Sequence, residues 1–450
     1  MRDRLLIIGG VAAGLAAAMQ ARRRAPELDI TVLEKSGDIS YGACGLPYVI
    51  SGLIPTLDQL RVHGPEYFRE RYGIDLRLHS EALEILPAKS IVRVRAGGET
   101  GEVREEGYTR LVLASGAQAV CPPLPGHTLA GIFVMRHLCD GRRMLDYLER
   151  VGPRTAVVVG AGYIGLEMAQ AFCERGLRTT IIEASHNVMS TLDGVLCERV
   201  AEELRAKGVE IIFGEKAAAF EGGAGRVERV LTETGRAVAA DIVNIGVGVR
   251  PQSTLAASAG LETGESGAIT TDAEQRTSVQ NIYAAGDCCE VLHRVSGRRV
   301  WFPLGQPAVR QGWVAGENAS GFEARYAGIV GTNVVKVFEL ELARTGLSLA
   351  EALASGFEAD AIESETPSRA SYYPGGSKIL TRLVYDRSGR LLGAQMVGRE
   401  GVAQRIDVYA AALHSNLKVD EIERLDLAYA PPYAPTIDPI QRAAHRAKLK

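Results

Sequence analysis

Seven cysteines are the first candidates for chemistry in this chain of 450 residues, at positions 44, 121, 139, 173, 197, 288 and 289. Their odd number and irregular spacing do not fit a secreted disulfide framework, and no pair has the C-x-x-C spacing of a zinc site. The eight histidines show no ligand spacing either, so no metal is predicted. A cysteine that matters in this sequence would therefore act through the reactivity of its thiol.

Two glycine-rich turns offer a second kind of chemistry. The run GGVAAG occupies residues 9–14 and the run GAGYIG residues 160–165, and each stands between an apolar run and a helix-forming stretch. A second apolar strand follows each turn and ends at an acidic residue, Glu34 or Glu183. These carboxylates stand 20 and 18 residues past the last glycine of their turns, the spacing of a βαβ dinucleotide fold.

Each residue of such a turn has a physical task. The first glycine, Gly9 or Gly160, permits the tight bend. The last glycine, Gly14 or Gly165, lets the helix pack closely on the strand. The helix N-terminus faces a pyrophosphate, and the distal carboxylate accepts hydrogen bonds from a ribose. The second turn also has the middle glycine, Gly162, where the first has a valine; two complete units predict two dinucleotide sites.

The elements that must position these turns begin at the N-terminus. The stretch MRDRLLIIGGVAAGLAAAMQARRR is basic and then apolar, like a signal peptide, but glycines split its apolar part. We therefore predict a strand, a glycine turn and a helix. No apolar run approaches the roughly 18 residues that cross a bilayer. The protein is therefore expected to be soluble and cytoplasmic. Its net charge of only −3 indicates neither a membrane surface nor a nucleic acid as partner.

The rest of the chain divides into domains. A buried strand ends in ASGA at residues 114–117, and the following PPLPG indicates a crossing between domains. Another strand ends in Gly286-Asp287, and β-rich segments begin near residue 327. We expect an α/β protein with two Rossmann-like dinucleotide-binding domains and a C-terminal α+β domain. The three would comprise residues 1–115 with 248–326, residues 116–247, and residues 327–450.

The two turns, the ASGA and Tyr-Ala-Ala-Gly-Asp strand ends and the C-terminal domain together resemble the pyridine nucleotide-disulfide oxidoreductases. The resemblance covers essentially the whole chain. It implies that the first fold binds FAD, the second binds NADH or NADPH, and the third domain forms a homodimer. The implied FAD contacts are Gly9, Gly14, Glu34, Lys35, Ala114 and Asp287. The implied nicotinamide dinucleotide contacts are Gly160, Gly162, Gly165 and Glu183, with Tyr163 as an aromatic gate over the flavin.

The cysteine pattern indicates a subclass of this family. The glutathione reductase type needs a C-x-x-x-x-C pair, but the residue five after Cys44 is Val49. Instead, ISYGACGLPY at residues 39–48 resembles the single-cysteine subclass of coenzyme A disulfide reductases, NADH peroxidases and NADH oxidases. The implied chemistry is attack of the Cys44 thiolate on a disulfide, with electrons supplied through the flavin. A position at the start of a helix and beside the flavin is expected to lower the pKa of Cys44.

Within the subclass, the chain most resembles the coenzyme A disulfide reductases. Ala12 stands where peroxidases and oxidases carry a histidine in the first turn. The runs YYPG at residues 372–375 and LAYAPPY at 427–433 imply that Tyr372 and Tyr429 are catalytic and reach the cysteine of the other subunit. Ala43 and Arg369 depart from the usual asparagine and histidine, which leaves the thiol substrate open. The residues that match a coenzyme A channel are Gln20, Arg23 and Ser40.

The predicted function is reduction of coenzyme A disulfide, or a related small disulfide or persulfide, by NAD(P)H through FAD and Cys44. An NADH oxidase or peroxidase that uses a cysteine sulfenic acid is the alternative enzyme. A flavin redox sensor or electron carrier that acts by binding proteins is the alternative of another class, and the Cys44 motif argues against it. Glu183 predicts a preference for NADH, because a carboxylate repels a 2′-phosphate. Cys288 and Cys289, beside Asp287, are interpreted as packing residues.

Overall fold

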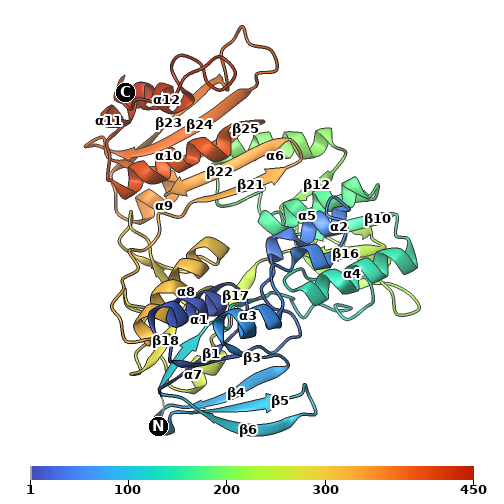
Figure 1. The fold of residues 1–450 in the computed structure, drawn as a ribbon. Helices are drawn as coiled ribbons and strands as arrows, with labels where there is room; N and C mark the ends of the chain where they lie inside the picture. Colours follow the sequence, from blue (N-terminus) through green and yellow to red (C-terminus); the bar gives the residue numbers. More distant parts are fainter. Residues whose placement is uncertain (1–2, 450) are drawn as a thin grey trace.

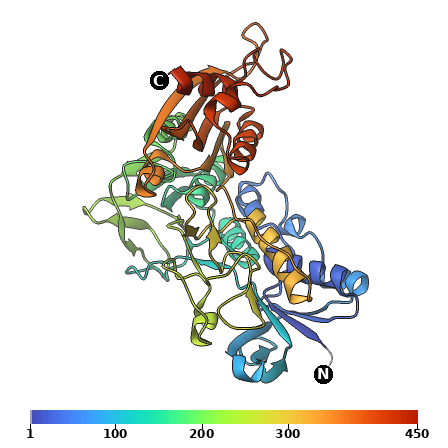
Figure 2. The same cartoon turned by 90° about the vertical axis from the view of Figure 1, so that its left-hand side faces the viewer.

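A computed structural model describes residues 3–449 and shows three sheet-based parts arranged from one end of the molecule to the other (Figure 1). Two five-stranded sheets belong to the dinucleotide folds, and a third five-stranded sheet belongs to the C-terminal domain. Figure 2 shows the same order from the side, with the C-terminal domain at the opposite end from the N-terminus.

The first sheet is parallel, with the strand order β18-β7-β1-β2-β3. Its central strands form from the apolar runs at residues 5–8, 30–33 and 111–113, which are buried on both faces as parallel strands require. The edge strand β18 comes from late in the chain, so this domain contains two separate segments. The strands are β1 Arg4–Ile8, β2 Asp29–Leu33, β3 Asp75–Arg77, β7 Arg110–Leu113 and β18 Ile282–Ala284.

Helices α1 (Ala12–Arg24) and α8 (Gly305–Ala319) pack lengthwise against each other over this sheet. A Cβ at Gly312 would lie 2.3 Å from the carbonyl oxygen of Ala13, and one at Gly316 would lie 2.2 Å from that of Ala17. The small residues of α1 therefore serve a backbone-to-backbone approach. The smaller elements of this domain are η1 Ala43–Gly45, α2 Leu46–Ser51, η2 Leu57–Leu60, α3 Pro65–Tyr72, β4 Ser80–Leu86, η3 Pro87–Lys89, β5 Ile91–Ala96, β6 Glu102–Gly107, α7 Thr254–Ser258, β19 Val291–Leu292 and β20 Arg299–Val300.

The second sheet is also parallel, with the order β12-β11-β10-β16-β9. Its strands are β9 Ile132–Phe133, β10 Thr155–Val159, β11 Arg178–Glu183, β12 Glu210–Phe213 and β16 Ile242–Ile245. Its helices are α4 Leu138–Val151, α5 Tyr163–Glu174 and α6 Gly194–Ala206. An antiparallel sheet accompanies them, made of β13 Ala217–Glu221, β14 Arg229–Thr232 and β15 Ala237–Ala239. Strands β8 (Ala117–Ala119) and β17 (Val249–Pro251) pair where the chain enters and leaves this domain.

The C-terminal sheet is antiparallel, with the order β21-β22-β25-β24-β23. Helices α10 and α12 pack on it, and α5 and α6 of the second domain contact it at β21 and β25. Its strands are β21 Asn333–Val337, β22 Leu340–Gly346, β23 Ala359–Pro367, β24 Lys378–Asp386 and β25 Leu391–Gly398. Its helices are α9 Leu349–Ala354, α10 Val402–His414, α11 Val419–Glu423 and α12 Pro439–Leu449.

This architecture confirms the predicted fold class of two Rossmann-like domains and a C-terminal α+β domain. The N-terminal segment forms strand, turn and helix as expected. The domain boundaries near residues 115, 247 and 326 stay predictions. Among residues 3–449, no helix is long and apolar enough to cross a membrane.

Candidate active site

The first glycine turn closes against the end of β7. Gly9 has a φ of +110°, which favours glycine, and its N–H donates to the Leu33 carbonyl at 2.8 Å. A Cβ at Gly9 would lie 2.2 Å from the carbonyl oxygen of Ala114, and one at Gly14 would lie 1.9 Å from that of Gly9. The strand ends and α1 therefore meet without side chains between them, as a phosphate-binding helix N-terminus requires.

Glu34 follows β2 beside this turn. One carboxylate oxygen accepts the Gly10 N–H at 2.8 Å, and the other accepts the N–H of Ser36 at 2.8 Å and its hydroxyl at 2.7 Å. Carboxylate oxygens carry about two lone pairs each, so Glu34 retains capacity for ribose hydroxyls. Lys35 points outward instead and pairs with Glu81 at 2.8 Å.

Asp287 lies just past β18, at the same edge of the first sheet. The Cβ position of the preceding Gly286 is 2.8 Å from the Ala13 side chain, so this strand end meets the start of α1. The Asp287 carboxylate pairs with Arg136 at 2.5 Å, and its carbonyl accepts the Trp301 indole N–H at 2.8 Å. Sequence reasoning missed Arg136, because no motif surrounds it and its partner is 151 residues away.

The second turn repeats the contacts of the first. Gly160 has a φ of +98°, and a Cβ at Gly165 would lie 2.1 Å from its carbonyl oxygen. One oxygen of Glu183 accepts the Ala161 N–H at 2.6 Å, and the other accepts the Ser185 N–H at 2.8 Å. In each domain, the glutamate thus accepts hydrogen bonds from the glycine turn and from the serine two residues after the glutamate.

Both turns fit a dinucleotide. Gly162 caps the N-terminus of α5, and nothing lies within 4 Å of its Cβ position, so a pyrophosphate can approach the backbone there. The residues Gly9, Gly14 and Glu34 fit the corresponding part of FAD at the first turn.

Cys44 lies in η1, directly before α2, and its side chain is exposed. The N–H of Ser40 donates to the Gly10 carbonyl at 3.3 Å, which ties the segment leading to Cys44 to the first turn. Loss of hydration raises the pKa of the Cys44 thiol, and the Glu167 carboxylate raises it further. Among the protein groups, the opposing effect of Arg136 does not outweigh desolvation and this nearby negative charge. The lowered pKa expected of Cys44 beside the flavin stays a prediction.

Glu167 is a second residue that sequence reasoning missed. Burial raises the pKa of its carboxyl group to about 7. It stands one helical turn after Tyr163 on α5, so the two side chains share a face of that helix. Its spacing of four residues from Tyr163, a predicted site residue, is the sequence feature that could have indicated Glu167. A carboxyl group that titrates near neutral pH beside a reactive thiol can accept or release a proton there.

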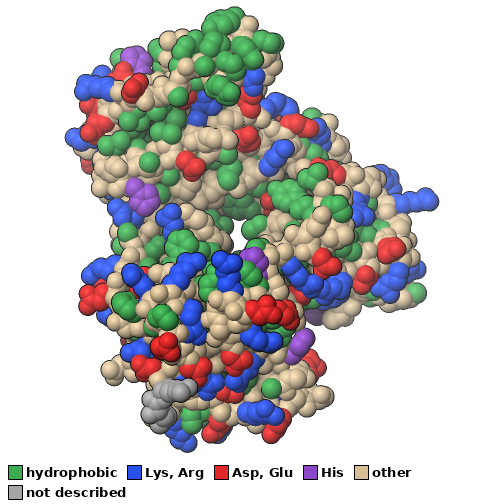
Figure 3. Space-filling model, viewed as in Figure 1, with side chains coloured by type: hydrophobic (Ala, Val, Ile, Leu, Met, Phe, Trp, Pro, Cys, Tyr) green, Lys and Arg blue, Asp and Glu red, His purple; other side chains and the backbone are tan. Residues whose placement is uncertain are grey.

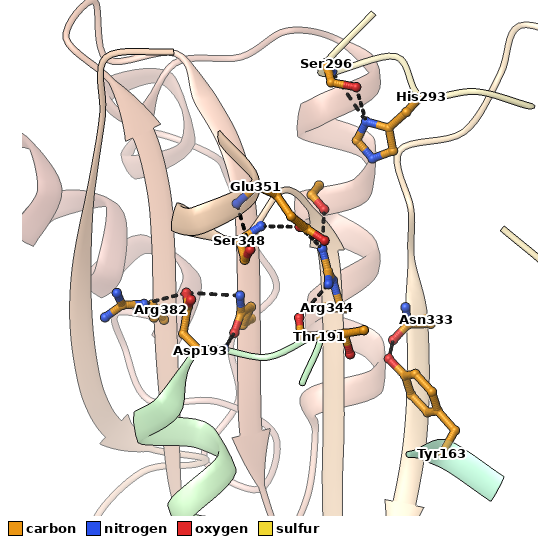
Figure 4. A network of polar contacts seen from close by, with 12 residues as sticks. Tyr163, Thr191, Asp193, His293, Ser296, Asn333, Arg344, Ser348, Glu351 and Arg382 are labelled. Carbon is orange, nitrogen blue, oxygen red and sulfur yellow. Dashed lines mark hydrogen bonds and ion pairs between the residues drawn. The ribbon is translucent and has the colours of Figure 1, made fainter. Parts of the chain in front are cut away.

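Tyr163, the first residue of α5, points toward Asn333 of the C-terminal domain (Figure 4). Its hydroxyl donates to the side-chain oxygen of Asn333 on β21. Burial raises the pKa of Tyr163, so the phenol remains a neutral donor.

Tyr372 and Tyr429 lie together at the end of the C-terminal domain, with their hydroxyl oxygens 3.3 Å apart. Both are exposed, by 74% and 48% respectively. The connection between β23 and β24, which carries Tyr372, lies at the opposite end of that domain from α2 (Figure 1). The structure thus pairs the two tyrosines but does not bring them to Cys44 of the same chain.

A cavity of about 580 Å³ includes Gln20 and Arg23, near the C-terminal end of α1, in its lining. Ser40 does not line it and lies beside the first glycine turn instead. The neighbouring Arg24 pairs with Glu317 at the cavity. Guanidinium groups next to aromatic rings suit a phosphorylated ligand with a planar ring. The cation and aromatic groups that sequence reasoning did not assign to this cavity are Arg310, Trp313, Tyr326 and His414.

The chain belongs to the pyridine nucleotide-disulphide oxidoreductase family, whose sequence pattern matches residues 3–312; the pattern of the family's dimerisation domain matches residues 332–439. The NAD(P)H sulfur oxidoreductase (CoA-dependent) of Pyrococcus abyssi is 38% identical over 442 residues, which cover 98% of this chain and 97% of that protein. The coenzyme A disulfide reductase of Staphylococcus aureus strain JH9 is 31% identical over 447 residues, 99% of this chain and 100% of that protein. The solved structure of an NAD-dependent persulfide reductase from A. fulgidus has a TM-score of 0.96 and 36% identity, and covers 99% of this chain and 83% of that chain.

These likenesses confirm the predicted family and its enzyme class, an NAD(P)H-dependent flavoprotein reductase. FAD and a nicotinamide dinucleotide are confirmed as the cofactors. The roles of the individual site residues stay predictions.

Proposed function

We propose that the protein reduces coenzyme A disulfide or a coenzyme A persulfide with NAD(P)H, through FAD and Cys44. One observation supports this proposal above all. The chain has both an exposed cysteine near the first glycine turn and a separate cavity lined by Gln20 and Arg23. A small disulfide such as cystine needs no such second cavity. A disulfide with a long arm that ends in a phosphorylated nucleotide does.

FAD supplies the transfer of two electrons from the dinucleotide to the sulfur site. The Cys44 thiolate attacks one sulfur of the disulfide, so that the substrate S–S bond breaks, a mixed disulfide forms on Cys44 and one thiolate leaves and takes a proton. Two electrons and the second proton then release the other thiol and restore Cys44. One NAD(P)H, one proton and one disulfide yield NAD(P)⁺ and two thiols.

We further propose that the enzyme is a cytoplasmic homodimer in which Tyr372 and Tyr429 of one subunit serve Cys44 of the other. An exposed aromatic and apolar patch at the end of the C-terminal domain supports this arrangement (Figure 3). Seven free cysteines suit a reducing compartment. The exposed large side chains of this patch are Tyr372, Tyr373, Tyr429, Tyr433 and Ile437.

The test is turnover of NADH with coenzyme A disulfide by the wild type and by Cys44→Ser. The serine variant is expected to keep its flavin absorbance and lose disulfide reduction, whereas Cys139→Ser, which also changes an exposed cysteine, should keep both. Full disulfide reductase activity in Cys44→Ser would contradict the mechanism. Rapid NADH consumption with oxygen and none with disulfides would instead identify an NADH oxidase.

A further inference from the structure

Four side chains form a row across the C-terminal sheet, which we call the polar row. Strand register places Asn333 opposite Arg344, Arg344 opposite Gln395, and Gln395 opposite Arg382. Residues directly opposite each other on neighbouring strands project from the same face of a sheet. Gln395 is 1% exposed and Arg344 is 6% exposed, so the middle of the row is buried.

The first two members contact the second dinucleotide domain at two points. Asn333 accepts the hydroxyl of Tyr163, at the start of α5. Arg344 donates to the main-chain carbonyl of Thr191, in the segment that follows Glu183 (Figure 4). Tyr163 belongs to the second glycine turn, and the segment that carries Thr191 is tied to the same turn by the Met189 N–H, which donates to the Ala161 carbonyl at 2.9 Å.

The other two members contact Asp193, two residues further along the same segment. Gln395 accepts the Asp193 N–H at 2.8 Å and donates to its carboxylate at 3.1 Å. Arg382 donates to that carboxylate at 2.7 Å. The whole row thus seats the second dinucleotide domain on the C-terminal sheet.

Contacts within the C-terminal domain also hold the polar row in place. Arg344 pairs with Glu351, and Glu351 also accepts the Ser348 N–H at 2.7 Å at the start of α9. Asn333 is a strand residue opposite this fixed arginine, so its position is set by the sheet. A movement of Tyr163 away from β21 therefore breaks this hydrogen bond.

We propose that Asn333 is a latch that holds Tyr163 in its resting position, so that a bound nicotinamide must first break this hydrogen bond. The proposal rests on the assignment of the GAGYIG turn to NAD(P)H and of Tyr163 as the gate. Asn333 is then a positioning residue: it acts on the dinucleotide through the tyrosine. Through it the C-terminal domain sets the affinity of the neighbouring domain for its cofactor.

A latch and a purely structural contact predict different changes in dinucleotide affinity when the hydrogen bond is lost. If the bond only joins two domains, its loss loosens the site and leaves dinucleotide affinity unchanged or weaker. If it is a latch, its loss removes a cost of binding. One hydrogen bond of ordinary strength then corresponds to a roughly two- to tenfold tighter dissociation constant.

The experiment is calorimetric titration of the oxidised holoenzyme with NAD⁺, which binds without turnover. Asn333→Leu and Tyr163→Phe should each tighten binding two- to tenfold. The Tyr163 hydroxyl also faces the Thr191 side chain, so the double variant should match Tyr163→Phe, which already lacks the bond to Asn333. Asn333→Asp keeps an acceptor oxygen, and a charged acceptor holds the hydroxyl at least as strongly, so this variant should not tighten binding. Lys336→Ala, an exposed change on the same strand, is the matched control and should also leave binding unchanged.

Unchanged or weaker binding in Asn333→Leu and in Tyr163→Phe overturns the latch. Additive effects in the double variant overturn it as well. Should Asn333→Leu fail to fold, Tyr163→Phe against Asn333→Asp carries the same test. If the wild-type holoenzyme binds no NAD⁺, the assignment of the second turn fails, and that outcome is distinct from a failed latch.

Discussion

The hydroxyls of Tyr372 and Tyr429 are hydrogen-bonded across 57 residues of sequence. Beneath them, the buried guanidinium of Arg405 donates to the carbonyls of Ser368 and Tyr433, at 3.1 Å each. One arginine thus joins the two segments that carry the tyrosines.

We expect the tyrosine pair to act on the other subunit's cysteine. Changing both Tyr372 and Tyr429 to Phe should slow disulfide reduction about 10²–10³-fold, because a donor to the departing thiolate is lost. Flavin reduction by NADH should stay nearly intact, since it does not need that donor. Stopped-flow absorbance separates the two steps.

Mixing the double-Phe protein with Cys44→Ser should restore activity, because one heterodimer site has both intact parts. If subunit exchange is demonstrated and no activity returns, the tyrosines do not act in trans.

Arg405→Met should lower the free energy of unfolding by about 3–5 kcal/mol, the usual cost of leaving one partner of a buried ion pair alone. Arg405 and Asp438 are 8% and 7% exposed, and their closest contact is 2.9 Å. Chemical denaturation measures the loss. Arg387→Met, which breaks the exposed pair with Glu358, should change stability by less than about 1 kcal/mol. Equal effects of the two substitutions would argue against this account of Arg405.

NADH should give a higher kcat/KM than NADPH. The Glu183 carboxylate is fixed by the Ala161 and Ser185 N–H groups where a ribose is expected, so it meets a 2′-phosphate with like charge. Glu183→Gln should narrow the preference, and Glu198→Gln, an exposed change on α6, should not. Steady-state kinetics with both cofactors decide this, and a wild-type preference for NADPH would refute it.

The pH dependence of Cys44 should depend on Glu167. Because its pKa is about 7, Glu167 is charged above that pH and then raises the pKa of the Cys44 thiol. Glu167→Gln should therefore lower the pKa of Cys44 and speed its alkylation by iodoacetamide at pH 8. Below about pH 6 the wild-type carboxyl group is mostly protonated, and the two proteins should react alike. Identical alkylation profiles across the whole range would exclude this coupling; Glu174→Gln is the control at the end of the same helix.

The two glycine turns could be predicted from local sequence alone. Gly9, Gly14 and Glu34 act through backbone approach and a fixed spacing along one βαβ unit, so their pattern is readable in about 30 residues. Arg136 and Asn333 left no such pattern, because each meets its partner only when separate domains pack together. The groups that raise the pKa of Cys44 left no pattern either. Its position at a helix start is local, but the partial loss of hydration and the Glu167 charge come from tertiary structure.

Helix α1 sets the distance between the first glycine turn and the cavity. Its first turn carries Gly14 at the first glycine turn, to which the Cys44 segment is tied, and its last turns carry Gln20 and Arg23 at the cavity. With 1.5 Å of rise per residue, these two residues lie roughly 12–17 Å from the start of the helix. The close packing of α8 along α1 keeps that spacing rigid. If the protein has the proposed function, we expect it to select its substrate by length as well as by chemistry, since only a thiol on a sufficiently long arm reaches Cys44 and the cavity at once.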